Sequence, residues 1–530
     1  MTAERCAWLP AFIAQLRKEN ILVDDAVAQT LAPARLVAVD VEDWGALARQ
    51  AALAGLRWCA VWGEEHGEEL SISACFEHGG DYLIARTAVS AKTPILPSHT
   101  PHYAAADRPG RHLQDMFGVV IADHPDARRW TRHNAWTDSE FPLRKGFDVA
   151  GEPPLETAPH SDYRFMLAQG AGVYEIPVGP IHAGIIEPGH FRFQAVGETV
   201  LNLEERLGYT HKGIEKIAEG RDPVSLARLA GRVSGDTTVA HAWAACMAME
   251  RAADIEIPER ALCLRALLAE RERIINHLWD VAMICNDVSY AFGFYQFGRL
   301  REDWLRLNRT VFGHRLMMDR MVPGGVSADV DVVNATLLLE QGDALNRELD
   351  ELLPILADNA SLQDRLQTTG VLSVELAARF GCVGYVGRAS GQDFDVRRDA
   401  PYAPYDRFDV AAPVFTSGDV AARMHVRFEE LRVSLRLQAQ ILASLAPGEL
   451  RAMWRRPTAG SEGLGIVDGW RGEIISFVRF DAQGCIARYF PRDPSWLTWP
   501  ALEKLIRDNI VPDFPVCNKS VNASYSGHDL

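Results

Sequence analysis

Cysteine is scarce in this sequence, and its cysteines are scattered. Nine occur among 530 residues, and no two of them form a CxxC pair. Because zinc ions and iron–sulfur clusters are commonly held by such pairs, we expect this chain to bind neither on its own. An odd, unpaired set of cysteines is typical of reduced thiols in the cytoplasm.

Long apolar runs and a surplus of positive charge are also missing. No run reaches the roughly 18 apolar residues that a membrane-spanning helix needs, and the first ten residues do not resemble a signal peptide. The formal net charge of −16 argues against a general nucleic-acid binder, because phosphate binding needs an excess of Lys and Arg. No GxGxxG motif follows a predicted strand, so no dinucleotide site is expected.

The composition that is present, 48% hydrophobic and 24% charged residues, is ordinary for globular protein. A length of 530 residues predicts two or more domains. The segment GFDVAGEPPLETAP, which begins at Gly146, is rich in Gly and Pro and predicts a linker. We therefore divide the chain into a domain at 1–145, a linker at 146–162 and a second domain at 163–530.

Hydrophobic periodicity predicts an α+β fold, with an α/β first domain and a second domain that combines small antiparallel sheets with a central helix bundle. Gly-containing turns between alternating segments predict three hairpins, at 70–87, 190–203 and 474–490. Helical spacing predicts helices at 8–16, within 223–321, at 332–367 and at 421–445. Residues 93–111, rich in Pro and polar residues, predict an extended surface segment.

Ordered motifs at the end of the first domain carry a resemblance. They are Asp115-Met116-Phe117-Gly118, His124-Pro125-Asp126, Arg128-Arg129 and Phe141-Pro142-Leu143-Arg144-Lys145. This stretch resembles the end of the 30-kDa subunit of respiratory complex I; the alternative is a capped loop with scattered arginines. The resemblance implies that the stretch packs against the second domain. The implied interface residues are Asp115, Arg128, Arg129, Arg144 and Lys145.

The second domain carries a longer series of motifs. They include Gly179-Pro180-Ile181-His182, Glu187-Pro188-Gly189-His190, His211-Lys212-Gly213-Ile214-Glu215-Lys216, Val322-Pro323-Gly324-Gly325 and Gly387-Arg388-Ala389-Ser390-Gly391. In this order they resemble the 49-kDa subunit of complex I and the large subunits of group 4 nickel–iron hydrogenases. The EPGH sequence and the fusion of the two domains favour the formate hydrogenlyase and hydrogenase-4 branch.

The cysteines that hold nickel in such hydrogenases are missing. Alignment of the motifs puts the four ligand positions on Ser234, Thr237, Ser524 and Gly527. Hydroxyl groups are poor ligands for soft metals, and glycine has no side chain. We therefore predict no metal and no cofactor bound by this chain itself.

The resemblance to complex I implies a second chemistry, the binding of a quinone. His182 matches the histidine that contacts the quinone head in that family, and Asp287 matches the aspartate that orients it, whereas the family's tyrosine falls on Gly235. A His–Asp pair can move protons. The alternatives are a histidine that bonds the loop backbone and an aspartate that caps or pairs structurally.

Glu215 matches the glutamate that passes protons in hydrogenases. If apolar groups bury it, its pKa rises and it can relay protons; the alternative is a surface ion pair with Lys212 or Lys216. Arg388, Arg397 and Arg398 match a stretch that faces the cluster-carrying partner in the family, and the alternative is a solvated basic loop.

The resemblance implies that the chain belongs to a larger assembly. The expected partners are a small iron–sulfur subunit that carries the nearest cluster, a membrane subunit of the quinone-channel type and antiporter-like subunits. The chain would then lie as a peripheral subunit on the cytoplasmic face of the membrane. The favoured function is an oxidoreductase subunit that couples electron transfer to proton movement without nickel. The sequence leaves two alternatives open, a non-catalytic scaffold derived from a hydrogenase and a quinone-reactive subunit of the NADH-dehydrogenase type.

Overall fold

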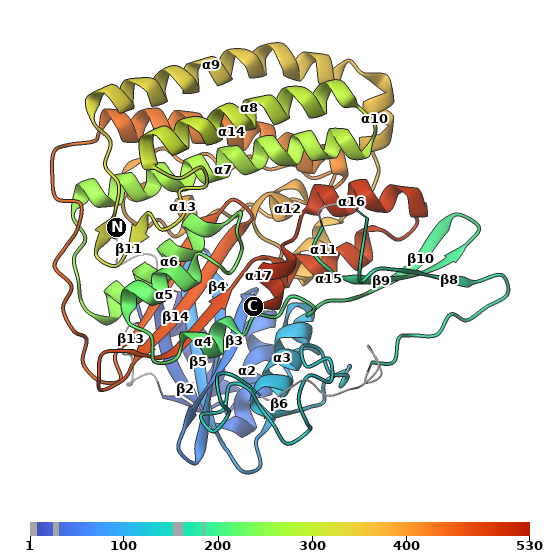
Figure 1. Ribbon diagram of the computed structural model, residues 1–530. Coiled ribbons are helices and arrows are strands. Elements are labelled where there is room, and N and C mark those ends of the chain that lie inside the picture. Colours follow the sequence, from blue (N-terminus) through green and yellow to red (C-terminus); the bar gives the residue numbers. More distant parts are fainter. Residues whose placement is uncertain (1–7, 25–30, 152–162, 184–185) are drawn as a thin grey trace.

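The computed structural model describes residues 8–24, 31–151, 163–183 and 186–530. A layer of long helices lies at one end, mixed helices and strands form the middle, and the N-terminal sheet lies at the other end (Figure 1). The predicted α+β class is confirmed. No helix in these residues is long and apolar enough to span a membrane.

The N-terminal sheet has five strands in the order β1-β2-β5-β4-β3, in which only the β2–β5 pairing is parallel. Gly79 and Gly80 form the β4–β5 turn with φ angles of 59° and 91°, which glycine adopts without strain. The hairpin predicted at 70–87 is confirmed. The strands are β1 (Val23–Asp24), β2 (Ala34–Val39), β3 (Arg57–His66), β4 (Glu69–His78) and β5 (Asp81–Ser90).

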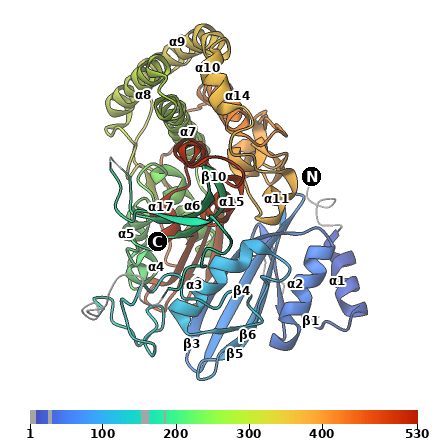
Figure 2. The same ribbon diagram turned by 90° about the vertical axis from the view of Figure 1, so that its right-hand side faces the viewer.

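Helices α1 (Trp8–Lys18) and α2 (Trp44–Leu53) pack with α3 (Asp107–Phe117) on one face of this sheet (Figure 2). The prediction that 93–111 is an extended surface segment is wrong, since the segment contains β6 (Ile95–Pro97) and the start of α3. Pro109 lies in the first turn of α3, where its missing N–H would have no helical partner anyway. The short strand β7 (Val120–Ala122) pairs with β6.

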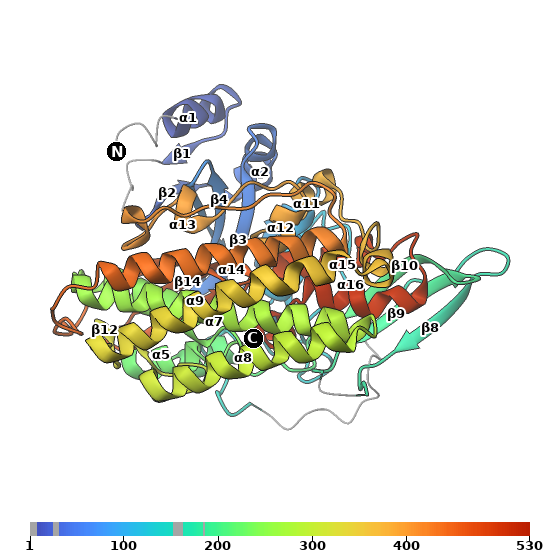
Figure 3. The same ribbon diagram turned by 90° about the horizontal axis from the view of Figure 1, so that it is seen from above.

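A three-stranded antiparallel sheet follows the predicted linker, of which residues 152–162 lie outside the described residues. Its strands are β8 (Tyr174–Val178), β9 (His190–Val196) and β10 (Thr199–Arg206), in the order β10-β9-β8. The hairpin predicted at 190–203 is confirmed. We call β8, β9, β10 and the preceding residues 165–173 the β-arm, because they extend beyond the body of the molecule (Figures 1 and 3).

Four long helices form the bundle: α7 (Glu259–Asp287), α8 (Ala291–Phe312), α9 (Val332–Ala357) and α14 (Val420–Ala443). Helix α7 is buried almost all round, as expected for a central helix. The helix predicted at 332–367 is instead two, α9 and α10 (Ala360–Leu366). The break is local, because the Asn359 side chain accepts a hydrogen bond from the Leu362 N–H and starts α10.

The remaining elements connect the bundle to the sheets. They are α4 (Ile214–Ala218), α5 (Pro223–Ala230), α6 (Thr238–Ala252), β11 (Met321–Val322), β12 (Gly325–Val326), α11 (Val374–Arg379), α12 (Gly384–Ala389), α13 (Val396–Asp399), β13 (Glu462–Gly469), β14 (Gly472–Phe480), β15 (Ile486–Arg492), α15 (Ser495–Leu505), α16 (Phe514–Val521) and α17 (Tyr525–Asp529). The β14–β15 pairing confirms the third predicted hairpin.

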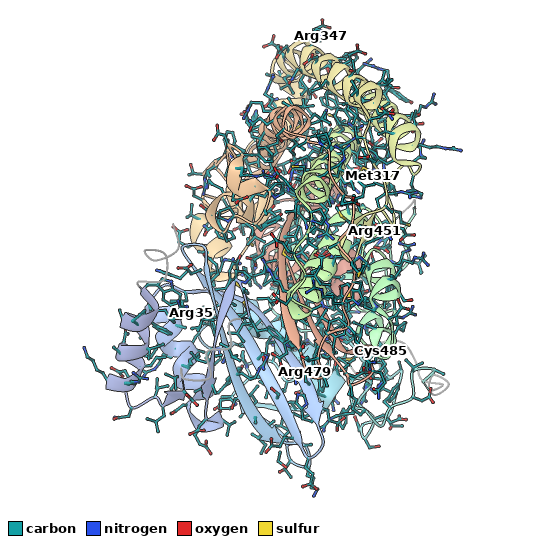
Figure 4. The ribbon with its side chains drawn as sticks, turned by 90° about the vertical axis from the view of Figure 1, so that its left-hand side faces the viewer. Arg35, Met317, Arg347, Arg451, Arg479 and Cys485 are labelled. Carbon is teal, nitrogen blue, oxygen red and sulfur yellow. The ribbon has the colours of Figure 1, made fainter. Side chains whose placement is uncertain are left out.

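The β13–β15 sheet packs against the N-terminal sheet, and this contact joins the two halves of the chain. Trp62 lies 5.2 Å from the rings of both Phe477 and Phe490. Arg479, labelled in Figure 4, donates to Glu64 at 3.0 Å. We call this contact the seam.

Candidate functional site

Two distant loops meet where the sequence predicts the degenerate ligand positions. Ser234 precedes α6, and Ser524 caps α17 by accepting a hydrogen bond from the Gly527 N–H. The hydroxyl oxygens of Ser234 and Ser524 lie 3.0 Å apart. Both side chains and that of Thr237 are buried. The structure therefore brings the two halves of the predicted ligand set together.

An ion pair that the sequence analysis did not find holds the first loop. Arg471, in the β13–β14 turn, donates to both carboxylate oxygens of Asp236 at 2.7 and 2.6 Å. Its Nε donates to the carbonyl of Asn522 at 2.7 Å, so Arg471 links both loops. Burial alone would raise the pKa of Asp236, but Arg471 outweighs it and holds the carboxyl below its usual range.

Asp236 also accepts hydrogen bonds from the hydroxyls of Ser234 and Thr237, at 2.7 and 3.0 Å. The hydroxyls at two of the predicted ligand positions therefore donate to a carboxylate that is already paired with an arginine. They are engaged in holding the loop and do not form an open set of metal ligands.

Asp493, which lies outside both loops, occupies the space beside Gly527, the fourth predicted ligand position. A Cβ atom at Gly527 would lie 2.7 Å from the carboxylate of Asp493, which is too close for any real contact. Asp493 is fixed by His241, whose Nε2 lies 2.8 Å from Oδ2, and by the backbone N–H of Ser495 at 2.8 Å. A side chain at residue 527 therefore has no room unless Asp493 moves.

A cavity of about 270 Å³ opens beside these residues. Its lining is mostly polar and joins four parts of the chain: Ile186, Glu187, Ser234, Gly235, Asp236, Arg471, Asn518, Lys519, Asn522, Ala523, Ser524, Tyr525 and Ser526. Serine hydroxyls, amides and paired charges suit a hydrogen-bonding ligand. They do not fit a nickel–iron centre, which needs soft thiolates.

Glu215 is buried, but in different surroundings from those predicted. Arg488 donates to its Oε2 at 2.5 Å, and Nε2 of His112, from the N-terminal domain, lies 3.1 Å from its Oε1. Burial alone would raise the pKa of Glu215, but Arg488 and His112 outweigh it and lower the pKa to about 2. The expected raised pKa is therefore wrong, and so is the alternative of a surface pair with Lys212 or Lys216.

His182 and Asp287 do not form an orienting pair in the structure. Nε2 of His182 lies 2.7 Å from the carbonyl oxygen of Gly189, which is the loop contact considered as an alternative. Asp287 is the last residue of α7, and burial raises its pKa although Lys519 partly opposes this. No hydrogen bond joins the two side chains in the described part of the chain.

Arg388 and Arg397 lie inside the molecule, each 1% exposed. Arg397 donates to Glu270 at 2.9 Å and to Asp395 at 2.7 Å, and Arg388 pairs with Glu430. Burial of charge is tolerated here because the carboxylates compensate it. Of the three predicted partner-facing arginines, only Arg398 is partly exposed, and it pairs with its neighbours Asp393 and Asp399.

The predicted interface residues lie where the first domain meets the second. Arg128 donates to Glu204 at 2.5 Å, and Lys145 donates to Glu219 at 2.8 Å. Arg129 and Arg144 contribute through their backbone carbonyls, which accept from Arg206 and Lys216. Asp115 acts from within the first domain, where it accepts the backbone N–H groups of Trp130 and Thr131.

Three family descriptions match successive parts of the chain. The 30 Kd subunit of respiratory-chain NADH dehydrogenase matches residues 37–153, nickel-dependent hydrogenase matches 212–280, and the 49 Kd subunit of respiratory-chain NADH dehydrogenase matches 287–463. The matches include the loop before α6. They do not include the loop at α17, because residues 464–530 lie beyond them.

Individual relatives cover more of the chain. Formate hydrogenlyase subunit 5 of Escherichia coli (strain K12) is 31% identical over 453 residues, which cover 84% of this chain and 79% of the relative. The C/D subunit of NADH-quinone oxidoreductase from Bacteroides thetaiotaomicron is 30% identical over 424 residues, covering 76% and 79%. A chain of the membrane-bound sulfane sulfur reductase, an archaeal respiratory membrane complex, superposes with a TM-score of 0.64 at 25% identity, covering 68% of this chain and 99% of that chain.

Proposed function

Since this chain belongs to the family of group 4 hydrogenase large subunits and fused 30-kDa/49-kDa complex I subunits, we propose that it is the large subunit of a membrane-associated oxidoreductase complex that works without a nickel–iron centre. The supporting observation is the pair of hydroxyls, Ser234 and Ser524, that meet 3.0 Å apart at the ligand positions. Hydroxyl groups do not replace thiolates as ligands of a soft metal, and the hydroxyl of Ser234 also donates to Asp236.

The proposed role is electron transfer coupled to proton movement, with the electrons arriving from an iron–sulfur cluster in a small partner subunit. The cavity beside Ser524 is the candidate place for an acceptor, and a quinone head group is one candidate because it accepts hydrogen bonds. His112, whose Nε2 lies 3.1 Å from Oε1 of Glu215, is the candidate proton carrier, because an imidazole ring can both accept and donate a proton whereas Glu215 stays ionised.

The complex can be tested by purifying the tagged chain from native membranes in mild detergent. We expect an iron–sulfur protein and integral membrane proteins to co-purify, with iron present and nickel well below one atom per chain. Nickel at one atom per chain would contradict the absence of the metal centre. Recovery of the chain alone would contradict the complex.

The second candidate is a scaffold without chemistry, which the loss of all four thiolates favours. A substitution that fills the cavity tests which of the two candidate functions is correct. Ser526→Trp, at the partly exposed mouth of the cavity, should abolish quinone-dependent oxidation of a reduced viologen dye by the purified complex while the same set of partner proteins is retained. Unchanged turnover in an intact complex would favour the scaffold.

A further inference from the structure

A second cavity lies in the helix bundle, away from the candidate site. Helices α9 and α14 run side by side there, and α10 follows the end of α9 (Figures 1 and 3). The cavity has a volume of about 410 Å³ and shares no lining residue with the polar cavity beside Ser524. Small-molecule sites usually measure about 300–1,000 Å³, so this space is large enough for a ligand of its own. We call it the bundle cavity.

The inner wall of the bundle cavity is apolar. It is formed by buried side chains from all three helices, namely Leu349, Leu356, Leu366, Met424 and Phe428. Phe415, from the segment before α14, adds a second aromatic ring. Ligand sites commonly combine such a wall with a few polar groups that fix the orientation of the ligand. The wall therefore fits the apolar body of a small molecule.

The end of α9 shapes one side of the bundle cavity. Pro354 lies inside α9 and has no N–H, which removes the helical hydrogen bond that the carbonyl of Asp350 would otherwise accept. Both residues line the cavity. Gln363 of α10 lines it too, and its amide donates to the Leu356 carbonyl at 3.0 Å. The wall therefore carries a backbone acceptor that has lost its helical partner.

The charged groups at the rim favour a cationic ligand. Glu429 and His425 lie one turn apart on α14, both are exposed, and neither forms a hydrogen bond or ion pair within the described residues. Arg432 is the one Lys or Arg among the described lining residues, and it already donates to Asp350 at 2.8 Å. An anionic ligand would therefore meet a cation that is already paired, whereas a cationic ligand would meet the unpaired carboxylate of Glu429.

The surroundings of the bundle cavity have the same preference. Residues 340–366, which include most of α9 and all of α10, contain seven Asp or Glu and two Arg, a formal charge of −5. A negative potential of this kind attracts cations and disfavours anions. Phe415 and Phe428 favour the same ligand, because the face of an aromatic ring attracts an ammonium group.

We propose that the bundle cavity binds an amphipathic amine, a small molecule with an apolar body and one ammonium group. The apolar body would lie against the buried wall, and the ammonium group would meet Glu429 at the exposed rim. Exposure of the rim leaves the ammonium group partly hydrated, which keeps the cost of removing its water low. The inference is independent of the proposed function, because the bundle cavity contains none of the residues of the polar cavity and its ligand takes no part in electron transfer.

Fluorine NMR of the purified full chain tests the ligand class. The probe is 2-(4-fluorophenyl)ethylamine, for which we expect saturable line broadening and a dissociation constant of about 1 mM or tighter, within reach of a ligand of about ten non-hydrogen atoms. The uncharged 2-(4-fluorophenyl)ethanol should bind about fivefold more weakly, and 3-(4-fluorophenyl)propanoate more weakly still. An amine that does not bind at about 10 mM, or a carboxylate that binds as tightly as the amine, would overturn the proposal.

Three variants at exposed positions locate the site. Glu429→Gln should weaken binding of the amine about fivefold and leave binding of the alcohol unchanged. Glu351→Gln is the matched control, because Glu351 is an exposed glutamate on α9 that does not line the cavity, and it should change neither. Ala357→Trp, at an exposed position of the lining, should weaken binding of both compounds by filling the cavity. Amine binding that is unchanged in Glu429→Gln or in Ala357→Trp would place the probe elsewhere and overturn the proposal.

Discussion

The polar groups at the seam differ from those at the cavity in both chemistry and exposure. At the seam, Glu473 is fully buried and its carboxylate binds Arg57, Arg492 and the hydroxyl of Tyr82. At the cavity, hydroxyls and amides line an open space, and the Asp236–Arg471 pair lies on its wall. The seam uses its charges to join the halves of the chain, whereas the cavity leaves polar groups facing solvent.

The loops that line the cavity are joined by an ion pair. Thiolates bound to one metal centre would link the loops before α6 and at α17, but here Arg471 links them, by binding Asp236 on one side and the Asn522 carbonyl on the other. The cavity can therefore change its lining while the seam keeps the surrounding fold.

Breaking the seam should have the largest effect. Glu473→Ala would leave Arg57 and Arg492 without their shared carboxylate in a buried position, which costs about 3–5 kcal/mol of unfolding free energy. Chemical denaturation of the purified chain measures this loss. Glu348→Ala removes an exposed carboxylate that pairs with Arg299 and should cost less than about 1 kcal/mol. Equal losses in the two variants would mean that the seam is not a stabilising contact.

Glu215 tests a second buried charge contact between the first domain and the second, the one with His112 and Arg488. Its pKa falls to about 2 in the folded chain because Arg488 and His112 outweigh the effect of burial. A carboxyl whose folded pKa is depressed contributes stability above its unfolded pKa of about 4.3, and this contribution is lost as pH falls toward the folded value. The contribution at neutral pH is about 3 kcal/mol.

Glu215→Gln should therefore lower stability at pH 7 and flatten its fall between about pH 5 and pH 2. Denaturation midpoints across that range, compared with wild type and with Glu198→Gln on the exposed β9–β10 turn, provide the measurement. If the wild type and Glu215→Gln lose stability in parallel as pH falls, then Glu215 is not held ionised by its partners.

The sequence predicted most of the framework because its signals are local. Gly79-Gly80 and Gly197-Glu198 mark turns between alternating strands, and the apolar spacing of 264–282 marks a buried helix. Motif order further predicted that Ser234 and Ser524 would correspond to one site, and the structure brings them into contact. A turn joins residues that are neighbours in the sequence, so the sequence pattern alone could predict these turns.

The partners of buried charges could not be predicted in this way. Asp236 and Arg471 are far apart in sequence, and Glu215 finds Arg488 and His112 in two different parts of the chain. Only packing decides whether an arginine such as Arg397 is exposed or paired inside. The sequence marks a tight turn at Arg471, which lies between Trp470 and Gly472. Nothing in the sequence identifies Asp236 as the residue that accepts hydrogen bonds from Arg471.

The smallest expected effect distinguishes two glycines of the candidate site. At Gly527 an added Cβ would meet the Asp493 carboxylate at 2.7 Å, whereas at Gly235 it would meet nothing within 4 Å. Gly527→Ala should therefore cost about 1–3 kcal/mol through overpacking, and Gly235→Ala should change stability by less than about 0.5 kcal/mol. Thermal denaturation of the two variants measures both. A Gly527→Ala variant as stable as wild type would show that Asp493 moves aside easily, in which case the fourth ligand position is still able to accept a side chain.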